Sequence, residues 1–352
     1  IQLYTYENYQ NTSYLADPRY YKEVKETVID ADGNERTFYN LYYQIEAGAN
    51  STLAEVKLGN NAQIGNYAFL FNVNLKKVEL GTDAKIGDYA FSTCKNLDTI
   101  NLNNVKSIGD YAFSGITTMV YTKRDSRYSY AYKYEIINGE LVATDYLRSS
   151  LASGITEANL GEGVQLGTGV FAYADKLTNV TLPESFTGKV SETDDGAETF
   201  ADNFVPAYAF TYAKALTSVD FTNVEGIGEY AFAFTALPSL DLSATEQIGT
   251  SAFTRTAATS VKLADGAKIG DRAFANCTNL ATAENLENVT EIGSEAFTRT
   301  QLSTLSLKEA EKVGDFAFAK TKITSVEFGD KLTEIGENPF YDCDIVSFGR
   351  EK

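Results

Sequence analysis

A six-residue pattern of apolar and small residues, Ile-Gly-x-x-Ala-Phe, returns about every twenty-two residues along the chain. A fixed period of this length is typical of stacked structural units, each of which buries its apolar face against its neighbours. The chain is therefore predicted to form a repeat solenoid. Strict copies begin at Ile64, Ile86, Ile108, Ile227, Ile248, Ile269 and Ile292, and relaxed copies at Leu166, Val205, Val313 and Ile335.

A second pattern, Leu-x-x-Val-x-Leu, precedes the motif, for example at residues 75–80 and 97–102. Its fourth and sixth places are apolar, and this period of two predicts a strand with one buried face. Within the motif, the glycine permits a sharp bend, and residues such as Asp88 and Asp271 at the third place are good helix N-caps. The motif is therefore predicted to be a turn into one short helical turn, with its Ala and Phe pointing inward.

Strand, turn and short helix at this period resemble the bacterial BspA-like class of leucine-rich repeat surface proteins. The resemblance rests on Ile-Gly-x-x-Ala-Phe followed by x-x-Cys-x-x-Leu, as at residues 86–97 and 269–280, and it covers roughly residues 50–350. It implies an α/β-type leucine-rich repeat solenoid, with parallel strands on one face and short helices or 3-10 turns on the other. It also implies an extracellular protein, on the bacterial cell surface or secreted, that functions in adhesion.

Composition narrows the function further. The chain has 352 residues and a net charge of −18, which argues against nucleic-acid binding because that needs a basic surface. No apolar run is long enough to span a bilayer. Histidine is absent, so a Ser-His-Asp or Cys-His catalytic system is impossible. We therefore expect that the protein is not an enzyme and that it binds no cofactor and no metal.

The three cysteines share one place in the repeat. Cys94, Cys277 and Cys343 each lie three residues after the motif Phe, where other copies carry small residues. At about 4.8 Å per coil, Cys94 and Cys277 are roughly 29 Å apart, which is too far for a disulfide. Three inert core thiols are predicted.

Interruptions of the repeat divide the chain into four predicted parts. They are a Tyr-rich cap at 1–50, a first repeat array at 51–121, a Tyr-rich basic insertion at 122–154, and a second array at 155–352. In the cap, Asp17-Pro18 predicts a helix start, and Tyr20, Val24 and Val28 would share one helix face. A hairpin is predicted to follow, ending in residues 38–45. Its turn resembles a calcium loop, but it lacks the distal Glu and has its glycine at the wrong offset, which favours a plain turn.

The insertion is the first candidate binding site. Residues 116–121 still fit a repeat strand, and Asn138-Gly139 predicts a hairpin further on. Between them lies a basic and aromatic cluster, a composition typical of interaction hot spots. The alternative is that these tyrosines cover the edge of the solenoid. The candidate partner-binding residues are Arg127, Tyr128, Tyr130, Tyr132 and Tyr134.

Two further features have open interpretations. Tyr67, Tyr89 and Tyr111 precede the motif Ala in successive copies and could bind a glycan or peptide, or could pack on one another. Residues 183–204 hold six acidic residues and one lysine, Lys189, which predicts an exposed acidic loop, with a hard-cation site as the alternative. The outward places of the Leu-x-x-Val-x-Leu strands are small and polar, which is typical of a solvated sheet face without a groove.

The sequence favours a non-catalytic extracellular protein that binds a macromolecular partner, either a host or matrix protein or a glycan. The alternative is a structural spacer or stalk that presents another domain. Partner identity, anchoring and oligomeric state are not predicted.

Overall fold

Each repeat forms one coil of a β-solenoid, with a short strand on each of two sides. The structure is a computed structural model that describes residues 21–29, 33, 35–43, 52–119, 121–124, 127–130, 132–137, 140–146, 148–151, 153–193 and 196–350. The chain divides into two units. The hairpin unit comprises Ile1–Ser51 and Ile116–Leu151, and the solenoid unit comprises Thr52–Gly115 and Ala152–Lys352.

One side of the solenoid unit, which we call the motif edge, is built from the Ile-Gly-x-x-Ala-Phe residues. Its strands stack in parallel from coil to coil in two sheets, of orders β18-β17-β15-β7-β6-β4 and β19-β21-β23-β25-β27-β29-β31. Only the β17–β18 pair is antiparallel. The first sheet has β4 (Gln63–Ile64), β6 (Ala84–Ile86), β7 (Val105–Ile108), β15 (Val164–Leu166), β17 (Phe186–Glu192) and β18 (Glu198–Asp202). The second has β19 (Phe204–Val205), β21 (Gly226–Ile227), β23 (Gln247–Ile248), β25 (Lys268–Ile269), β27 (Glu291–Ile292), β29 (Lys312–Val313) and β31 (Glu334–Ile335).

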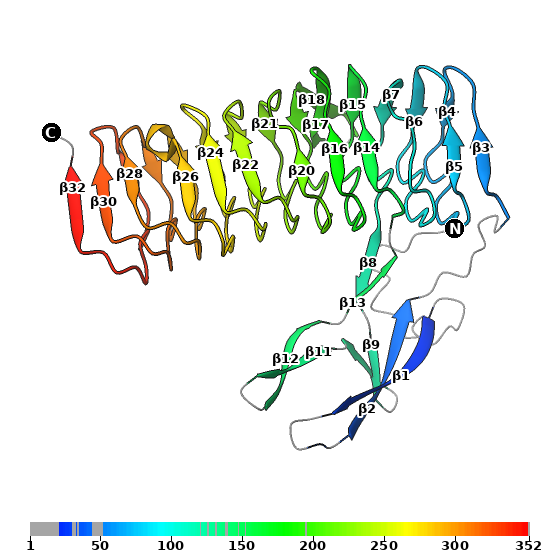
Figure 1. Cartoon of the computed structure of the whole chain (residues 1–352), viewed down its shortest axis with the longest axis horizontal. Coiled ribbons are helices and arrows are strands. Elements are labelled where there is room, and N and C mark those ends of the chain that lie inside the picture. Colours follow the sequence, from blue (N-terminus) through cyan, green and yellow to red (C-terminus); the bar gives the residue numbers. More distant parts are fainter. Residues whose placement is uncertain are drawn as a thin grey trace. The chain divides into compact units, whose positions relative to one another are not determined.

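The opposite side, the leucine face, carries the Leu-x-x-Val-x-Leu strands, and Figure 1 shows them side by side along the solenoid. They form four short parallel sheets, of orders β3-β5, β14-β16-β20, β22-β24-β26 and β28-β30-β32. The first two contain β3 (Glu55–Lys57), β5 (Lys77–Glu79), β14 (Glu157–Asn159), β16 (Asn179–Thr181) and β20 (Ser218–Val219). The last two contain β22 (Ser239–Leu242), β24 (Ser260–Leu263), β26 (Thr282–Glu284), β28 (Leu305–Leu307), β30 (Ser325–Phe328) and β32 (Ser347–Arg350).

The core of the solenoid unit is a continuous stack of the motif phenylalanines. Successive rings lie nearly parallel, for example Phe232 and Phe253 with centroids 5.4 Å apart. Phe253 and Phe274 repeat this geometry at 5.4 Å, and both rings are fully buried. Across the insertion, Phe113 stacks on Phe171 at 5.6 Å. The coils on either side of the insertion are therefore packed directly on each other.

The helical turn predicted in the motif is wrong. The motif residues form consecutive turns, and the 3-10 helix described in the solenoid unit, η3 (Leu286–Asn288), lies on the leucine face. The fourth place has positive φ in every coil, as at Tyr89 (53°) and Arg272 (56°), and so does the eighth place in ten coils, as at Arg255 (57°). Alternate backbone N–H groups point to the next coil, as when Phe91 N donates to the carbonyl of Ala112 at 2.8 Å. The short-helix part of the α/β prediction is thus replaced by a β-solenoid.

The third motif place acts between coils rather than as a helix cap. The carboxylate of Asp88 accepts a hydrogen bond from the N–H of Asp110 at 2.8 Å, and that of Asp110 accepts one from Thr168 at 2.7 Å. The motif glycine also has a role other than the predicted bend, because its φ is not positive. A Cβ on Gly249 would lie 2.8 Å from the backbone of the preceding coil, so close stacking requires glycine here.

The hairpin unit contains antiparallel sheets. One has the order β1-β2-β9-β10, made of β1 (Tyr21–Ile29), β2 (Glu35–Tyr43), β9 (Tyr121–Arg124) and β10 (Arg127–Tyr130). The others pair β11 (Tyr132–Ile137) with β12 (Glu140–Tyr146), and β8 (Ile116–Met119) with β13 (Arg148–Leu151). The β1–β2 pair confirms the N-terminal hairpin, and the Ile137–Glu140 pairing confirms the hairpin predicted from Asn138-Gly139.

Two predictions in this unit are wrong. Residues 21–29 form a strand where a helix was predicted, since a spacing of four residues, as between Val24 and Val28, also fits the two-residue period of a strand. Residues 116–119 are not a repeat strand, because β8 pairs antiparallel with β13. Asp17, Pro18 and the turn residues Asp30, Asp32 and Asn34 lie outside the described residues.

Candidate functional site

The predicted acidic loop is an ordered hairpin, β17–β18, that joins the sheet of the motif edge. Its lysine, Lys189, is 5% exposed and lies among three carboxylates. The ammonium donates to Asp110 at 2.9 Å, to Glu192 at 2.6 Å and to Glu198 at 2.7 Å. The lysine therefore links the hairpin to the third motif place of a preceding coil. The described acidic residues of the segment are exposed, as predicted, but the segment is a hairpin rather than a loop and its lysine is buried.

The same cluster bears on the alternative prediction, that the 183–204 segment holds a hard-cation site. Carboxylate oxygens of Asp110, Glu192 and Glu198 lie within 4.8 Å of one another, a spacing that suits a hard cation. The Lys189 ammonium already stands at hydrogen-bond distance from all three. Burial lowers the pKa of Lys189, but its hydrogen bonds to the three carboxylates outweigh this and raise it overall, so the lysine stays charged. The protein supplies its own cation here.

The predicted tyrosine column packs on itself. The rings of Tyr67 and Tyr89 stack with centroids 5.3 Å apart, and those of Tyr89 and Tyr111 with centroids 5.2 Å apart. The ring of Tyr111 then covers Gly169, where a Cβ would lie 2.2 Å from a ring carbon. The stacked faces are used within the protein, which leaves ring edges and hydroxyls, and the outer face of Tyr67, for any ligand. Binding at these residues stays a prediction.

The packing changes the acidity of the phenols. Burial, with the neighbouring Tyr111 and Tyr67, raises the pKa of Tyr89 to about 12. Burial, followed by the charge of Glu229, raises the pKa of Tyr208 to about 12. Both hydroxyls are therefore neutral hydrogen-bonding groups at physiological pH.

The structure separates the residues predicted in the insertion. Arg127, Tyr128 and Tyr130 belong to β10, an edge strand of the four-stranded sheet. Tyr132 and Tyr134 belong to β11, in a different sheet. Their side chains lie outside the described part of the structure, so their role as a binding cluster stays a prediction.

Sequence reasoning missed a second column, at the eighth motif place, which we call the outer ridge. Its aromatic end is a stack in which Tyr173 lies 5.0 Å from Tyr212 and Tyr212 lies 4.1 Å from Phe234, between centroids. The guanidinium of Arg255 lies over Phe234 at 5.5 Å, and the Lys214 ammonium over Tyr212 at 5.7 Å. We keep the name outer ridge for the middle part of this column, and the column continues to Phe71 and Thr93 at one end and to Asp342 at the other. The outer ridge is the row Tyr173, Tyr212, Phe234, Arg255, Asn276, Arg299 and Lys320.

The other end of the outer ridge is basic. Arg255, Arg299 and Lys320 are exposed. Within the described residues none of the three makes an ion pair with a carboxylate, whereas Arg272 on the neighbouring column pairs with Glu295 at 2.5 Å. In a chain of net charge −18, these three unpaired cations occupy one column over four coils, interrupted by Asn276, and form a local positive strip. Aligning the copies on the eighth place would have revealed this signal in the sequence.

The family comparison identifies the repeat. A family model described as a BspA type leucine rich repeat region matches in six copies, over residues 42–136, 203–311 and 307–350. A crystal structure of a leucine-rich repeat protein from Bacteroides ovatus ATCC 8483 is 20% identical, with a TM-score of 0.45, and the match covers 88% of this chain and 87% of that one. The pneumococcal vaccine antigen PcpA is 12% identical, with a TM-score of 0.31 and coverage of 94% and 89%. A search of curated proteins finds no match.

Among the described residues, no helix is long and apolar enough to cross a membrane.

Proposed function

Because the chain belongs to the family of BspA-type leucine-rich repeat proteins, we propose that it is a non-catalytic bacterial protein, secreted or on the cell surface, that binds a macromolecular partner. Its solenoid is the rigid support for this contact. The absence of histidine from the whole sequence supports a binding role over catalysis, since the commonest general base is missing.

The observation that carries this proposal is the outer ridge. It joins stacked rings, including Tyr212 and Phe234, to the exposed cations Arg255, Arg299 and Lys320. Tyrosine and arginine dominate the energetics of protein interfaces, and a positive strip selects partners with complementary negative charge. The proposed partner is therefore an acidic region of a host or matrix protein.

The insertion gives a second candidate surface for the same function. Arg127, Tyr128 and Tyr130 lie on an edge strand, and edge strands offer unpaired backbone groups to a partner chain. The alternative function, a spacer that presents another domain, is favoured by the continuous coil-to-coil packing of the solenoid, which needs no binding surface.

The test is binding of the purified chain to an array of immobilised matrix proteins and glycans. We compare the wild type with the ridge variant Arg255→Gln/Arg299→Gln/Lys320→Gln. A control variant, Lys76→Gln/Lys85→Gln/Lys106→Gln, removes the same charge from exposed residues of the first coils. We expect the ridge variant to bind about tenfold more weakly, a loss of about 1.4 kcal/mol, and the control to bind like the wild type.

Other outcomes of the array are decisive in different ways. Equal loss in both charge variants would show a non-specific charge effect and would remove the ridge as the site. Loss only when Arg127, Tyr128, Tyr130 and Tyr132 become alanine would transfer the site to the insertion. An array without any binder would favour the spacer.

A further inference from the structure

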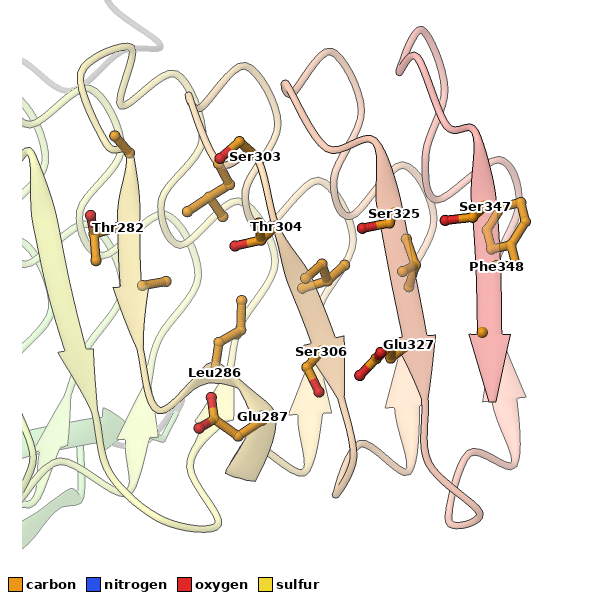
Figure 2. Close-up of a pocket in the computed structure, with 16 residues that line it drawn as sticks. Thr282, Leu286, Glu287, Ser303, Thr304, Ser306, Ser325, Glu327, Ser347 and Phe348 are labelled. Atoms are coloured by element: carbon orange, nitrogen blue, oxygen red, sulfur yellow. The ribbon is translucent and has the colours of Figure 1, made fainter. Parts of the chain in front are cut away.

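The leucine face contains a groove of about 760 Å³ that spans β26, β28, β30 and β32. Figure 2 shows Thr282, Ser325 and Ser347 on β26, β30 and β32, at one level with Thr304, which directly precedes β28. Ser306 and Glu327 lie two residues further along their strands. Glu287 faces the groove from the segment after β26. The expectation of a plain solvated face without a groove is therefore wrong at this end of the solenoid.

The groove has a local cause in the sequence. Residue 283, which faces inward, is alanine, whereas Val261 on the preceding strand and Leu305 on the following strand are larger. The repeat also gains one residue here, Asn285, which has a φ of 67°. Together they leave space between β26 and β28, which are not hydrogen-bonded neighbours in any sheet.

The extra residue is held toward the preceding coil. The side-chain amide of Asn285 donates to the carbonyl of Leu263 at 3.1 Å and to Asp265 at 2.8 Å, and the amide of Asn288 donates to Asp265 at 2.8 Å. This network fixes the position of η3, whose Leu286 and Glu287 line the groove, so this wall of the groove is part of the folded structure.

The lining of the groove is rich in free hydroxyls. The residues at the third place of the Leu-x-x-Val-x-Leu strands are Ser or Thr in seven successive coils, and their hydroxyls make no hydrogen bond within the described residues. Threonines one place earlier, such as Thr156 and Thr178, instead donate to backbone carbonyls of the preceding coil. The free row is Ser218, Ser239, Ser260, Thr282, Thr304, Ser325 and Ser347.

A further hydroxyl in the groove is unsatisfied. The Oγ of Ser306 is shielded from solvent and has no hydrogen-bond partner among the described residues. A buried polar group without a partner costs about 1–3 kcal/mol, so this side chain is a local defect in the wall of the groove. Two carboxylates, Glu287 and Glu327, add acceptors, and no lysine or arginine lines the groove.

The spacing of the row discriminates between ligands. Within the β28-β30-β32 sheet, successive strands present a hydroxyl about every 4.8 Å. An extended peptide repeats its side-chain direction about every 6.6 Å, so it falls out of register with the row. A linear glycan advances by close to one strand spacing per pyranose ring, so each ring meets one coil. The carboxylates disfavour an acidic glycan.

We infer that this groove is a binding site for a linear, uncharged polysaccharide that lies along the solenoid axis across β26, β28, β30 and β32. Its ring hydroxyls hydrogen-bond with Thr304, Ser325 and Ser347 and with the carboxylates of Glu287 and Glu327. The inference goes beyond the proposed function, because the site lies on a different side of the coil from the outer ridge and takes a ligand of a different class.

The test is calorimetry of the whole chain with short linear neutral oligosaccharides of β-linked glucose, mannose or xylose. The variant Ala283→Val adds two methyl groups to the inner wall of the groove, with the residue that Val261 and Val326 place at the equivalent position of their strands. We expect at least one neutral oligosaccharide to bind the wild type, and to bind Ala283→Val at least about tenfold more weakly, a change of about 1.4 kcal/mol. The melting temperature of this variant should not fall, because the substitution fills space.

A second variant checks the hydroxyls directly. Thr304→Ala/Ser325→Ala/Ser347→Ala should also lose binding, while Thr99→Ala/Ser218→Ala, at the same strand place outside the groove, should bind like the wild type. The ridge variant should bind the oligosaccharide normally, so the two proposals can fail separately. Binding that survives Ala283→Val, preference for an oligogalacturonate or for a lysine-containing peptide, or no oligosaccharide binding by the wild type would each overturn the inference.

Discussion

The two sides of the coil solve the same stacking problem differently. On the motif edge, backbone groups connect neighbouring coils without a gap through the seven strands from β19 to β31. On the leucine face, the strands form four separate sheets of two or three strands each. The first side keeps the coils in register, and the second side tolerates interruption.

The difference has a chemical basis. On the motif edge the glycines allow backbone contact, and side chains such as that of Asp88 bridge to the amide of the next coil. The leucine face depends on short strands and on packing of apolar side chains. One extra residue, Asn285, and one small residue, Ala283, are therefore enough to open a groove there. Variation that would damage the motif edge becomes a site on the leucine face.

The largest expected effect comes from the point where a hairpin interrupts the motif edge. Replacing Lys189 by alanine leaves Asp110, Glu192 and Glu198 without their shared cation. Removal of one partner of a buried ion pair is strongly destabilising, and we expect a loss of about 3 kcal/mol in the free energy of unfolding. Urea denaturation in the presence of a chelator measures it.

The same variant has a second, specific readout. The three carboxylates remain within 4.8 Å of one another, so millimolar calcium should bind Lys189→Ala and restore part of its stability. Calcium should leave the wild type unchanged, because the ammonium occupies the position. A Lys189→Ala protein as stable as the wild type without calcium would show that the hairpin is held by its strand pairing alone.

A smaller effect tests the close approach of coils on the motif edge. Gly249→Ala places a Cβ 2.8 Å from the backbone of the preceding coil and should cost about 2 kcal/mol of stability. Gly65 occupies the same motif place in the first copy and has nothing within 4 Å, so Gly65→Ala should change stability by less than about 0.5 kcal/mol. Equal effects of the two substitutions on urea midpoints would mean that backbone conformation, rather than contact, selects glycine.

The smallest effect concerns the tyrosine column. The pKa values of Tyr89 and Tyr208 are raised to about 12, so these phenols should ionise later than exposed tyrosines in a spectrophotometric titration. A raised pKa means that their contribution to stability is complete below pH 10 and is lost as the pH rises through 12. Tyr89→Phe should keep that contribution at high pH and remove the late phase assigned to Tyr89. A single titration near pH 10 for all tyrosines would contradict the packed column.

Much of the fold was accessible from the sequence because a repeat states its core many times. The period, the strands with one buried face, the inward Ala and Phe, and the buried slots of Cys94 and Cys277 are confirmed. Cys343 is only half-buried, in the last coil. The predicted helical turn failed for a definite reason. Asp and Asn at the third motif place can accept from the first turn of a helix or from the amide of a neighbouring coil, and the sequence alone does not distinguish these donors.

The candidate sites were less accessible because they depend on three-dimensional neighbours. The six acidic residues of the 183–204 segment suggest a segment extended by charge repulsion. A single lysine, Lys189, instead forms ion pairs with two of them and with Asp110. The outer ridge is invisible to composition, since its rings and cations are more than twenty residues apart along the chain. The groove arises from a small residue, Ala283, and from an additional residue of the repeat, Asn285. Neither residue type by itself indicates a binding site.

The left-handed residues of the motif edge have an implication for how such chains diversify. At the fourth and eighth places the backbone adopts the same conformation whether the side chain is Tyr, Phe, Arg, Glu or Lys. This conformation recurs in every coil at the fourth place and in ten coils at the eighth, so it does not constrain which side chain is chosen. The side chains emerge at intervals of about 4.8 Å. Substitutions in these two columns can therefore change binding specificity one coil at a time while the fold stays constant.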